Sequence, residues 1–382
     1  MIYGTEEKHP GKRGDKMGNT LRKLKKIFKD KHILITGQTG FKGSWLSIWL
    51  NMLGAKVVGY ALDPYTQRDN FVLSNISRSI VDIRGDIRDY DKLNRIFKEY
   101  SPEFVFHLAA QSLVREGYER PKETYDINIG GTVNILENCR KNKNVKVVII
   151  VTSDKCYENK EWIWGYREID AMGGYDPYSS SKACAELVTS AYLNSFFNPK
   201  EIKLHGKGLA SARAGNVIGG GDWAKDRLIP DCIRALENKE SIKVRNPDST
   251  RPWQYVLEPL GGYLLLATKL ANEPARFSGA WNFGPNSYSI VKVSKIIELV
   301  IKFWGAGTWK NIHKPSTPHE AGMLSLDISK ARFQLGWNPC LNLSETLEST
   351  IEWYKQSQNR SNIPNFCKTE IIKYMKKMQI NE

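Results

Sequence analysis

The stretch His32-Ile-Leu-Ile-Thr-Gly-Gln-Thr-Gly-Phe-Lys-Gly-Ser-Trp-Leu-Ser-Ile-Trp-Leu50 joins a short apolar run to a glycine-rich turn and a second apolar segment. The first run, residues 32–35, has the length and composition of a buried strand. The segment from Trp45 to Leu50 shows the apolar spacing of a helix. The order strand, glycine turn, helix indicates the first unit of an α/β fold.

Four more apolar runs continue this rhythm, at residues 56–60, 79–83, 104–108 and 145–151. Helical patterns such as residues 90–100 and 130–140 lie between them. Strands that alternate with helices predict an α/β protein with a Rossmann-like, doubly wound parallel sheet. Beyond residue 200 the alternation of strands and helices becomes less regular, and clusters of Gly, Pro and Asn appear. This change favours a smaller C-terminal substrate-binding lobe.

These patterns suggest four regions of the chain. Residues 1–29 are expected to be a basic, disordered extension, and residues 359–382 a basic tail. Residues 30–205 are expected to form the Rossmann domain, to which some later segments return. Residues 206–358 are expected to form mainly the substrate-binding lobe.

Composition limits the classes of function. Of the net charge of +15, residues 1–32 contribute +6 and residues 358–382 contribute +3. The central part is therefore only mildly basic, and we expect neither a nucleic-acid partner nor a membrane partner. The six cysteines show no Cys-x-x-Cys pair and no metal-ligand spacing, so we expect reduced thiols, no metal and a soluble cytoplasmic protein.

The glycine turn is the first candidate binding site. Its glycines, Gly37, Gly40 and Gly43, would let the backbone approach a pyrophosphate at the N-terminus of the following helix. Glycines also end strands for steric reasons, but this position favours a dinucleotide. Asp63 follows the second strand and is the candidate ligand for a ribose, although a turn before Pro64 is an alternative. Arg68 could favour a 2′-phosphate, so the residues alone leave NAD and NADP open.

A second candidate site is Tyr178-Ser-Ser-Ser-Lys182, in which a phenol and an ammonium lie four residues apart on one face of a helix. The lysine cation is expected to lower the pKa of the tyrosine, so that its phenolate can accept a proton from a substrate alcohol. Directly after the fifth strand, Ser153 is expected to bind the same hydroxyl. Asp154 and Lys155 add a charged pair that a simple oxidoreductase does not need; a surface ion pair is the alternative.

Several segments resemble the extended short-chain dehydrogenase/reductase family. They are the glycine turn within residues 36–46, His107-Leu-Ala-Ala-Gln111, Ser153-Asp-Lys155 and Tyr178-Ser-Ser-Ser-Lys182. The segments Phe41-Lys-Gly-Ser-Trp-Leu46, Asp154-Lys155 and Arg251-Pro-Trp-Gln254 resemble the CDP-glucose branch of its sugar-nucleotide 4,6-dehydratases. The resemblance covers about residues 30–355. The dTDP-glucose branch carries Asp-Glu in place of Asp154-Lys155.

The resemblance implies NAD as cofactor and CDP-glucose as substrate. The catalytic residues it implies are Ser153, Asp154, Lys155, Tyr178 and Lys182. The cofactor-binding residues it implies are Gly37, Thr39, Gly40, Phe41, Lys42, Gly43, Asp63, Asp86, Ile87, Leu108, Ala109, Ala110, Tyr178 and Lys182. The substrate-binding residues it implies are Gln111, Asn216, Arg227, Arg251 and Tyr255, with His319 and Glu320 in the same cleft.

In the implied reaction, Tyr178 removes the C4 hydroxyl proton, Lys155 removes the C5 proton and Asp154 protonates the departing C6 hydroxyl. The alternatives are a UDP-sugar 4-epimerase, a GDP-mannose 4,6-dehydratase and, from another class, a catalytically silent NAD-binding regulator. An epimerase would leave Asp154 and Lys155 without a role. The resemblance also implies a homodimer or homotetramer, with the Tyr178 helix at the dimer interface, and deoxysugar synthesis for a bacterial surface polysaccharide such as O-antigen.

Overall fold

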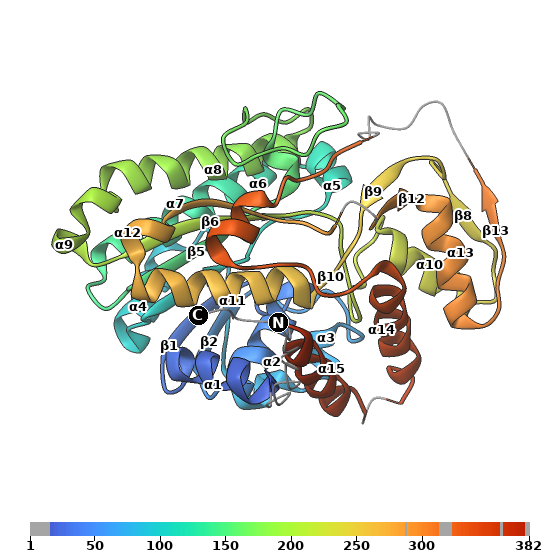
Figure 1. The fold of residues 1–382 in the computed structure, drawn as a ribbon, viewed down its shortest axis with the longest axis horizontal. Helices are drawn as coiled ribbons and strands as arrows, with labels where there is room; N and C mark the ends of the chain where they lie inside the picture. Colours follow the sequence, from blue (N-terminus) through green and yellow to red (C-terminus); the bar gives the residue numbers. More distant parts are fainter. Residues whose placement is uncertain (1–15, 287–288, 313–322, 360–361, 379–382) are drawn as a thin grey trace, which may run out of the picture.

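A computed structural model describes residues 16–286, 289–312, 323–359 and 362–378. Its centre is a seven-stranded parallel sheet in the order β11-β6-β5-β4-β1-β2-β3 (Figure 1). The strands are β1 (His32–Thr36), β2 (Lys56–Ala61), β3 (Val81–Arg84), β4 (Phe104–His107), β5 (Val147–Val151), β6 (Gly208–Ala214) and β11 (Gly279–Phe283). This order is that of a Rossmann fold with one added strand, so the predicted fold class is confirmed.

Successive residues of each strand point to opposite faces of the sheet, and each face has its own core. Ile33 and Ile35 of β1 pack into one hydrophobic cluster, whereas Leu34 packs into the other. The first face is covered by α1 (Lys16–Phe28), α2 (Phe41–Met52), α11 (Leu257–Asn272) and α15 (Ile363–Lys377). The second face is covered by α4 (Tyr90–Tyr100), α7 (Gly131–Lys141) and α8 (Pro177–Ser195).

The second lobe lies near the carboxyl ends of the strands of the central sheet. It consists of two-stranded sheets and helices. Its strands are β7 (Val217–Ile218), β8 (Ile242–Val244), β9 (Thr250–Pro252), β10 (Gln254–Tyr255), β12 (Ile290–Lys292) and β13 (Trp309–Asn311). They form the pairs β10-β7, β12-β9 and β13-β8. Its helices are α10 (Leu228–Glu237), α13 (Val293–Trp304) and α14 (Leu343–Gln356).

Short helices and turns complete the chain. The short helices are α3 (Asn70–Leu73), α5 (Val114–Glu119), α6 (Pro121–Tyr125), α9 (Ile202–His205) and α12 (Pro274–Phe277). The π-helical turns are Asp126–Gly130 and Ala331–Leu335, and the 3-10 turns are Ile76–Ser79, Asp154–Cys156 and Pro199–Glu201. Although they follow residue 206, β6 and β11 pair within the central sheet.

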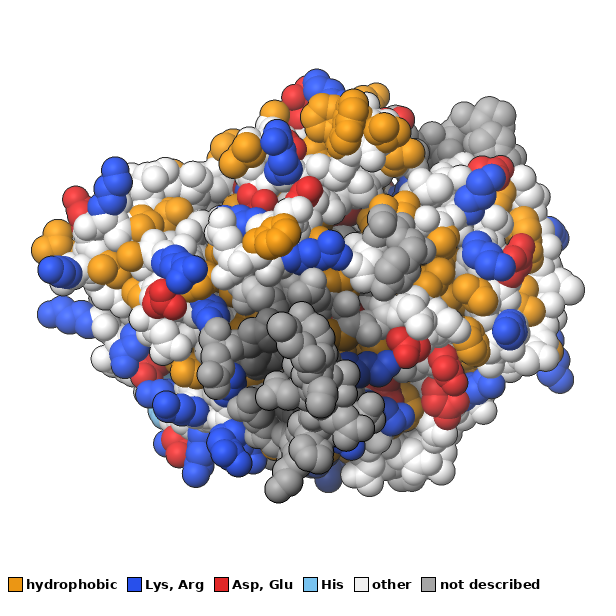
Figure 2. All heavy atoms as spheres, viewed as in Figure 1, with side chains coloured by type: hydrophobic (Ala, Val, Ile, Leu, Met, Phe, Trp, Pro, Cys, Tyr) orange, Lys and Arg blue, Asp and Glu red, His pale blue; other side chains and the backbone are white. Residues whose placement is uncertain are grey.

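The two ends of the chain differ from expectation. The disorder expected over residues 1–29 is wrong from residue 16 onward, because α1 buries Leu24 and Phe28 in the core; residues 1–15 lie outside the described residues. The expected basic tail contains α15, which packs against α1. Thr20 donates a hydrogen bond to the Met378 carbonyl at 3.1 Å, so both ends meet on one face of the sheet (Figure 1). In Figure 2, Lys and Arg side chains are spread over this view with Asp and Glu among them.

Candidate active site

A cleft of about 1170 Å³ runs along the carboxyl edge of the sheet and continues between the two lobes. Parallel α/β sheets bind ligands at this edge, where the order of strands reverses. Among the described residues, every one that the sequence predicted for cofactor, catalysis or substrate lines this cleft, with the exception of Tyr255. The sequence motifs, which lie far apart in the chain, therefore converge on one place.

The glycine turn leads from β1 to the N-terminus of α2. Gly37 has a positive φ of 78°, and a Cβ at this position would lie 2.8 Å from the backbone nitrogen of Ala109. A Cβ on Gly43 would lie 2.0 Å from the carbonyl oxygen of Gly37, so the turn folds back tightly on the helix. A Cβ on Gly40 would meet only that same oxygen, at 3.4 Å. The turn thus forms a cradle of backbone at a helix N-terminus, which suits a pyrophosphate.

Lys42 is the unusual residue of this turn because it brings a cation to the cradle. Burial in the cleft lowers the pKa of Lys42 to about 7, and nearby Lys182 and Arg227 lower it further while Asp154 acts in the opposite direction. The sequence predicted a cofactor contact at Lys42 but not this perturbed amine.

The predicted nucleoside contacts lie at the far end of the same cleft. The side chain of Asp63 is 89% exposed, with one carboxylate oxygen 3.7 Å from the Arg84 guanidinium. The carboxylate of Asp86 accepts hydrogen bonds from Arg88, which lower its pKa. Arg68, the residue that could have favoured a 2′-phosphate, forms an ion pair with Glu237 and lies over the ring of Trp223 at 3.6 Å.

Ser153, Asp154 and Lys155 follow β5 in a 3-10 turn, Asp154–Cys156. Asp154 is buried; its carboxylate accepts a hydrogen bond from the Ser153 hydroxyl at 2.9 Å and one from the Asn216 amide at 3.4 Å. A Cβ on Gly215 would lie 1.8 Å from the Asp154 carboxylate, so this close approach requires glycine. Lys155 lines the cleft, and its ammonium has no hydrogen-bond or ion-pair partner among the described residues.

Tyr178 and Lys182 lie one helical turn apart at the start of α8, which Asp176 caps by accepting from the Ser179 backbone N–H. Burial raises the pKa of Tyr178 to about 12, while a hydrogen bond with Ser153 acts in the opposite direction. The net pKa of Tyr178 is therefore raised and not lowered, because desolvation is the largest of the effects on it. Burial also lowers the pKa of Lys182 to about 8, and the Glu186 carboxylate raises it again.

A buried ion pair behind these residues was not predicted from the sequence. The Glu186 carboxylate pairs with the Arg213 guanidinium at 2.8 Å and also accepts from the hydroxyls of Thr152 and Ser211. Arg213 in turn donates to the Tyr157 hydroxyl at 2.6 Å. The signal available in the sequence was the spacing of Glu186, four residues after Lys182 on the same face of α8.

The predicted substrate residues Gln111, Asn216, Arg227 and Arg251 also line the cleft. The Arg227 guanidinium pairs with the Asp222 carboxylate at 2.7 Å and donates to the Ser112 hydroxyl at 3.0 Å. Arg251 lines the cleft and donates to the Thr250 carbonyl. Asn216 has a left-handed φ of 49°, which aims its amide at Asp154. The side-chain amide of Gln111 binds the Thr124 hydroxyl at 2.9 Å.

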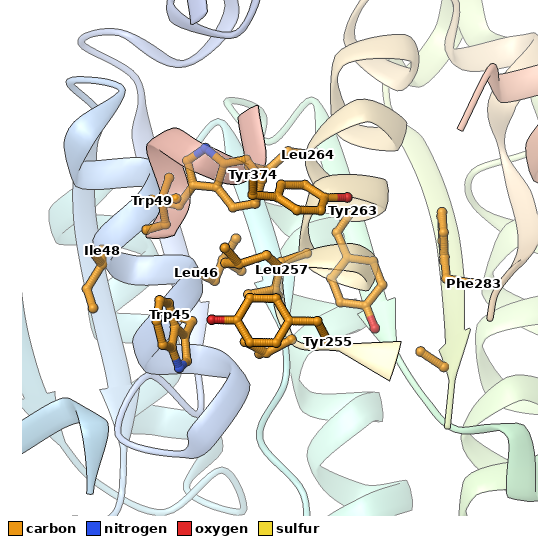
Figure 3. Close-up of a cluster of buried hydrophobic side chains, with 14 of the residues drawn as sticks. Trp45, Leu46, Ile48, Trp49, Tyr255, Leu257, Tyr263, Leu264, Phe283 and Tyr374 are labelled. Carbon is orange, nitrogen blue, oxygen red and sulfur yellow. The ribbon is translucent and has the colours of Figure 1, made fainter. Parts of the chain in front are cut away.

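Tyr255 is a correction, because the structure buries it completely outside the cleft. Its ring packs edge-on against Trp45 with ring centroids 6.4 Å apart, and Figure 3 shows it among Leu257 and Tyr263 in the core. Both residues of β10, Gln254 and Tyr255, are buried, and neither lines the cleft. His319 and Glu320 lie outside the described residues.

His107 is a packed core histidine. It is buried at the end of β4, and its ring shares hydrogen bonds with Thr36 at 2.7 Å and Thr132 at 3.3 Å. Burial lowers its pKa to about 3. Across the described ranges, no three His, Cys, Asp or Glu residues are grouped to hold a metal ion, and no helix is long and apolar enough to span a membrane.

The chain is similar to proteins of known activity. The chain matches the family described as GDP-mannose 4,6 dehydratase over residues 34–350. It is 51% identical over 351 residues to a CDP-glucose 4,6-dehydratase of Salmonella typhimurium strain LT2, covering 92% of this chain and 98% of the relative.

Two solved structures show the same fold. An epimerase from Methanothermobacter thermautotrophicus superposes with a TM-score of 0.75 at 22% identity and covers 94% of this chain and 99% of its own. A dTDP-glucose 4,6-dehydratase from Bacillus anthracis, in complex with NAD, superposes with a TM-score of 0.71 at 20% identity and covers 86% and 98%.

Proposed function

This chain belongs to the GDP-mannose 4,6 dehydratase family, and from this membership we propose that it is an NAD-dependent hydro-lyase that converts CDP-glucose to CDP-4-dehydro-6-deoxyglucose. The observation that carries the proposal is that Asp154 and Lys155 lie in the same cleft as Tyr178 and Lys182. Identity of 51% to a CDP-glucose 4,6-dehydratase supports the choice of nucleotide.

The cradle at residues 37–43 fits a dinucleotide, because any side chain at Gly37 or Gly43 would collide with backbone. Gly37, Gly40 and Gly43 would hold the pyrophosphate, and Asp63 and Asp86 would approach the ribose and adenine. When bound, NAD supplies the acceptor for the C4 hydride and returns that hydride to C6. NAD is also named in the complex of the Bacillus anthracis dehydratase.

Tyr178 is the proposed base at the C4 hydroxyl. Its hydroxyl is buried beside Ser153, which orients the same substrate oxygen. Because burial raises the pKa of Tyr178 to about 12, the phenolate needs positive charge close by. Lys182 supplies one such charge, and Glu186 keeps that ammonium protonated by raising its pKa.

Lys155 and Asp154 carry the elimination of water. The C4 ketone makes the C5 proton acidic, and Lys155 in its neutral form accepts that proton. Asp154 in its protonated form donates to the leaving C6 oxygen, so the proton gained by one residue balances the proton lost by the other. Ser153 and Asn216 hold the Asp154 carboxyl group in place through two hydrogen bonds.

The alternative reactions differ in whether they require Asp154 and Lys155. A 4-epimerase rotates a ketone and returns hydride to C4, so it needs no acid or base at C5 and C6. Asp154 and Lys155 therefore favour the dehydratase. A GDP-mannose 4,6-dehydratase would use the same chemistry on another nucleotide, and only the substrate separates it from our proposal.

The decisive experiment offers the purified protein NAD with CDP-glucose, dTDP-glucose, UDP-glucose or GDP-mannose, followed by mass spectrometry. We expect loss of water from CDP-glucose alone. A product of unchanged mass would make the protein an epimerase, and dehydration of GDP-mannose would reassign the nucleotide. In D₂O, Lys155→Met should abolish incorporation of deuterium at C5 while C4 oxidation persists; full dehydration and exchange in this variant would exclude Lys155 as the base.

The setting of the reaction is also proposed. All six cysteines are free thiols, four of them buried, which fits the reducing cytoplasm. The product is a deoxysugar precursor, which fits the synthesis of a bacterial surface polysaccharide such as O-antigen. We propose a homodimer or homotetramer, with α8 in the dimer interface.

A further inference from the structure

A short segment of the second lobe, residues 222–227, reaches across the cleft to the Rossmann domain. It makes two contacts with the segment around α5: Arg227 donates to the Ser112 hydroxyl at 3.0 Å, and Asp226 pairs with Arg115 at 3.3 Å. The same oxygen of Asp226 lies 3.4 Å from the guanidinium of Arg245, directly after β8. Two arginines from the two lobes therefore share one carboxylate in the cleft.

We propose that Asp226 stands in for a phosphate of the substrate, and that the diphosphate of the sugar nucleotide displaces it to bind Arg115 and Arg245. This inference rests on the proposed function, because it requires a nucleoside diphosphate in the cleft. It adds two phosphate ligands that the sequence did not predict, and it links substrate binding to the contact between the lobes.

The geometry of the group suits such an exchange. Arg115, Asp226 and Arg245 all line the cleft, and their side chains are 34%, 43% and 28% exposed. Ion pairs that are this exposed contribute little stability, so the carboxylate is readily replaced. A diphosphate carries more charge and several acceptor oxygens, and it can satisfy both guanidinium groups at once.

The neighbours of Asp226 keep the segment in place during the exchange. Arg227 is held by the largely buried Asp222 carboxylate at 2.7 Å, and the Tyr354 hydroxyl binds the Asp222 carbonyl. Release of Asp226 therefore frees one side chain and leaves the segment attached. The φ of Asp226, 59°, is one that aspartate tolerates better than most residues.

The expected change in affinity for CDP is opposite for a substitution of Asp226 and for substitutions of Arg115 and Arg245. Asp226→Asn removes a competing anion, so CDP should bind several-fold more tightly. Arg115→Gln and Arg245→Gln remove phosphate ligands, so CDP should bind about tenfold more weakly in each case. None of the three changes should affect the affinity for cytidine, which has no phosphate.

Isothermal titration of CDP and of cytidine into the full chain with NAD tests these predictions. Glu273→Gln and Arg276→Gln serve as controls, because this pair forms an exposed ion pair at α12 that does not line the cleft. Arg245→Lys retains the charge and should recover part of the lost affinity. Thermal unfolding of each variant checks that the fold is intact.

Each outcome has a distinct meaning. Weaker binding of both CDP and cytidine to Asp226→Asn would show that Asp226 contacts the nucleoside and would overturn the inference. Unchanged CDP affinity in both arginine variants would overturn it as well, while the proposed function would stand. If the unaltered protein bound neither CDP nor CDP-glucose, the proposed function would fail first and the inference with it.

Discussion

The carboxylate of Asp154 leaves no room for a side chain at residue 215. A Cβ there would lie 1.8 Å from an Asp154 oxygen, and Asn216 next to it donates to the same carboxylate. Gly215→Ala should therefore displace the acid and lower kcat by about 10²-fold, since displacement of a catalytic group by about 1 Å has this effect. Steady-state kinetics on CDP-glucose measure it.

The matched control for Gly215→Ala is Gly130→Ala, where a Cβ would meet nothing within 4 Å. We expect Gly130→Ala to retain activity and Gly215→Ala to keep its KM while losing kcat. Wild-type kcat in Gly215→Ala would mean that the position of Asp154 does not limit the reaction.

Lys182 makes the reaction sensitive to alkaline pH. Burial lowers the pKa of Lys182 to about 8, so its ammonium is lost as the pH rises through this value, and kcat/KM should fall with it. The Glu186 carboxylate raises this pKa, so Glu186→Gln should move the alkaline limb to lower pH. A pH profile of kcat/KM checks the shift.

The Glu186→Gln variant also breaks a buried ion pair with Arg213, so its unfolding temperature is measured alongside. The profile is recorded well below that temperature. An alkaline limb that stays at the wild-type pH would mean that Glu186 does not act on Lys182. A shift to higher pH would contradict the sign of the charge effect.

The elements around the glycine turn could be predicted because each is encoded by adjacent residues. The expected helix at residues 90–100 matches α4, and the expected strand at 56–60 is one residue shorter than β2. Ser153, Asp154 and Lys155 follow the end of β5, and the ends of parallel strands share one edge of the sheet. The Glu186–Arg213 pair joins α8 to β6. A pattern of neighbouring residues does not predict which residue of a distant strand will be the partner of Glu186.

The two terminal helices were missed because the positive charge of these segments was given more weight than the spacing of their apolar residues. Leu24 and Phe28 recur at the interval of a helix turn in α1, as do Cys367, Ile371 and Tyr374 in α15. These buried faces pack into the hydrophobic core, while most of the lysines project outward. The periodic signal was present in the sequence, but net charge was a poor guide to disorder.

Glu258 joins α11 to the C-terminal part of the chain. Its carboxyl group accepts from the backbone N–H groups of Cys340 and Leu341 at 2.7 Å and from the Tyr374 hydroxyl at 2.8 Å. Burial raises its pKa from 4.5 to about 7. The stability this group contributes is therefore full below pH 4.5 and is lost as the pH rises through about 7.

Glu258→Gln should remove this pH dependence, because an amide retains an acceptor for both N–H groups and carries no charge. Relative to wild type, its free energy of unfolding should gain about 3 kcal/mol between pH 4.5 and 8, the equivalent of the shift to about 7. Urea unfolding at both pH values measures the change. Glu348→Gln, at an exposed position of α14, is the control, and equal behaviour of the two variants would exclude Glu258 as the source.

At the scale of the whole molecule, the cleft lies between two lobes, and the chain passes from one lobe to the other and back. The chain leaves the central sheet after β6, returns to it at β11, and ends on the helices that cover the sheet. Both walls of the cleft are therefore anchored to one core. The proposed substrate residue Arg227 and the proposed cofactor residue Gly37 are held by the same packed body, which fits the proposed reaction, because that reaction must keep a sugar aligned through three steps.

The outer face of α8 is the candidate surface for self-association. Leu187 is 58% exposed on this helix, while Tyr178 and Lys182 face the cleft from its first turns. An isologous dimer places the same helix of both copies against each other, so one charged substitution enters the interface twice. Leu187→Glu should reduce the mass in solution from a multiple of 43.6 kDa to a single chain, measured by light scattering after size exclusion. Leu204→Glu, at an 83% exposed leucine of α9, should leave the oligomer intact; a multimer that survived Leu187→Glu would move the interface elsewhere.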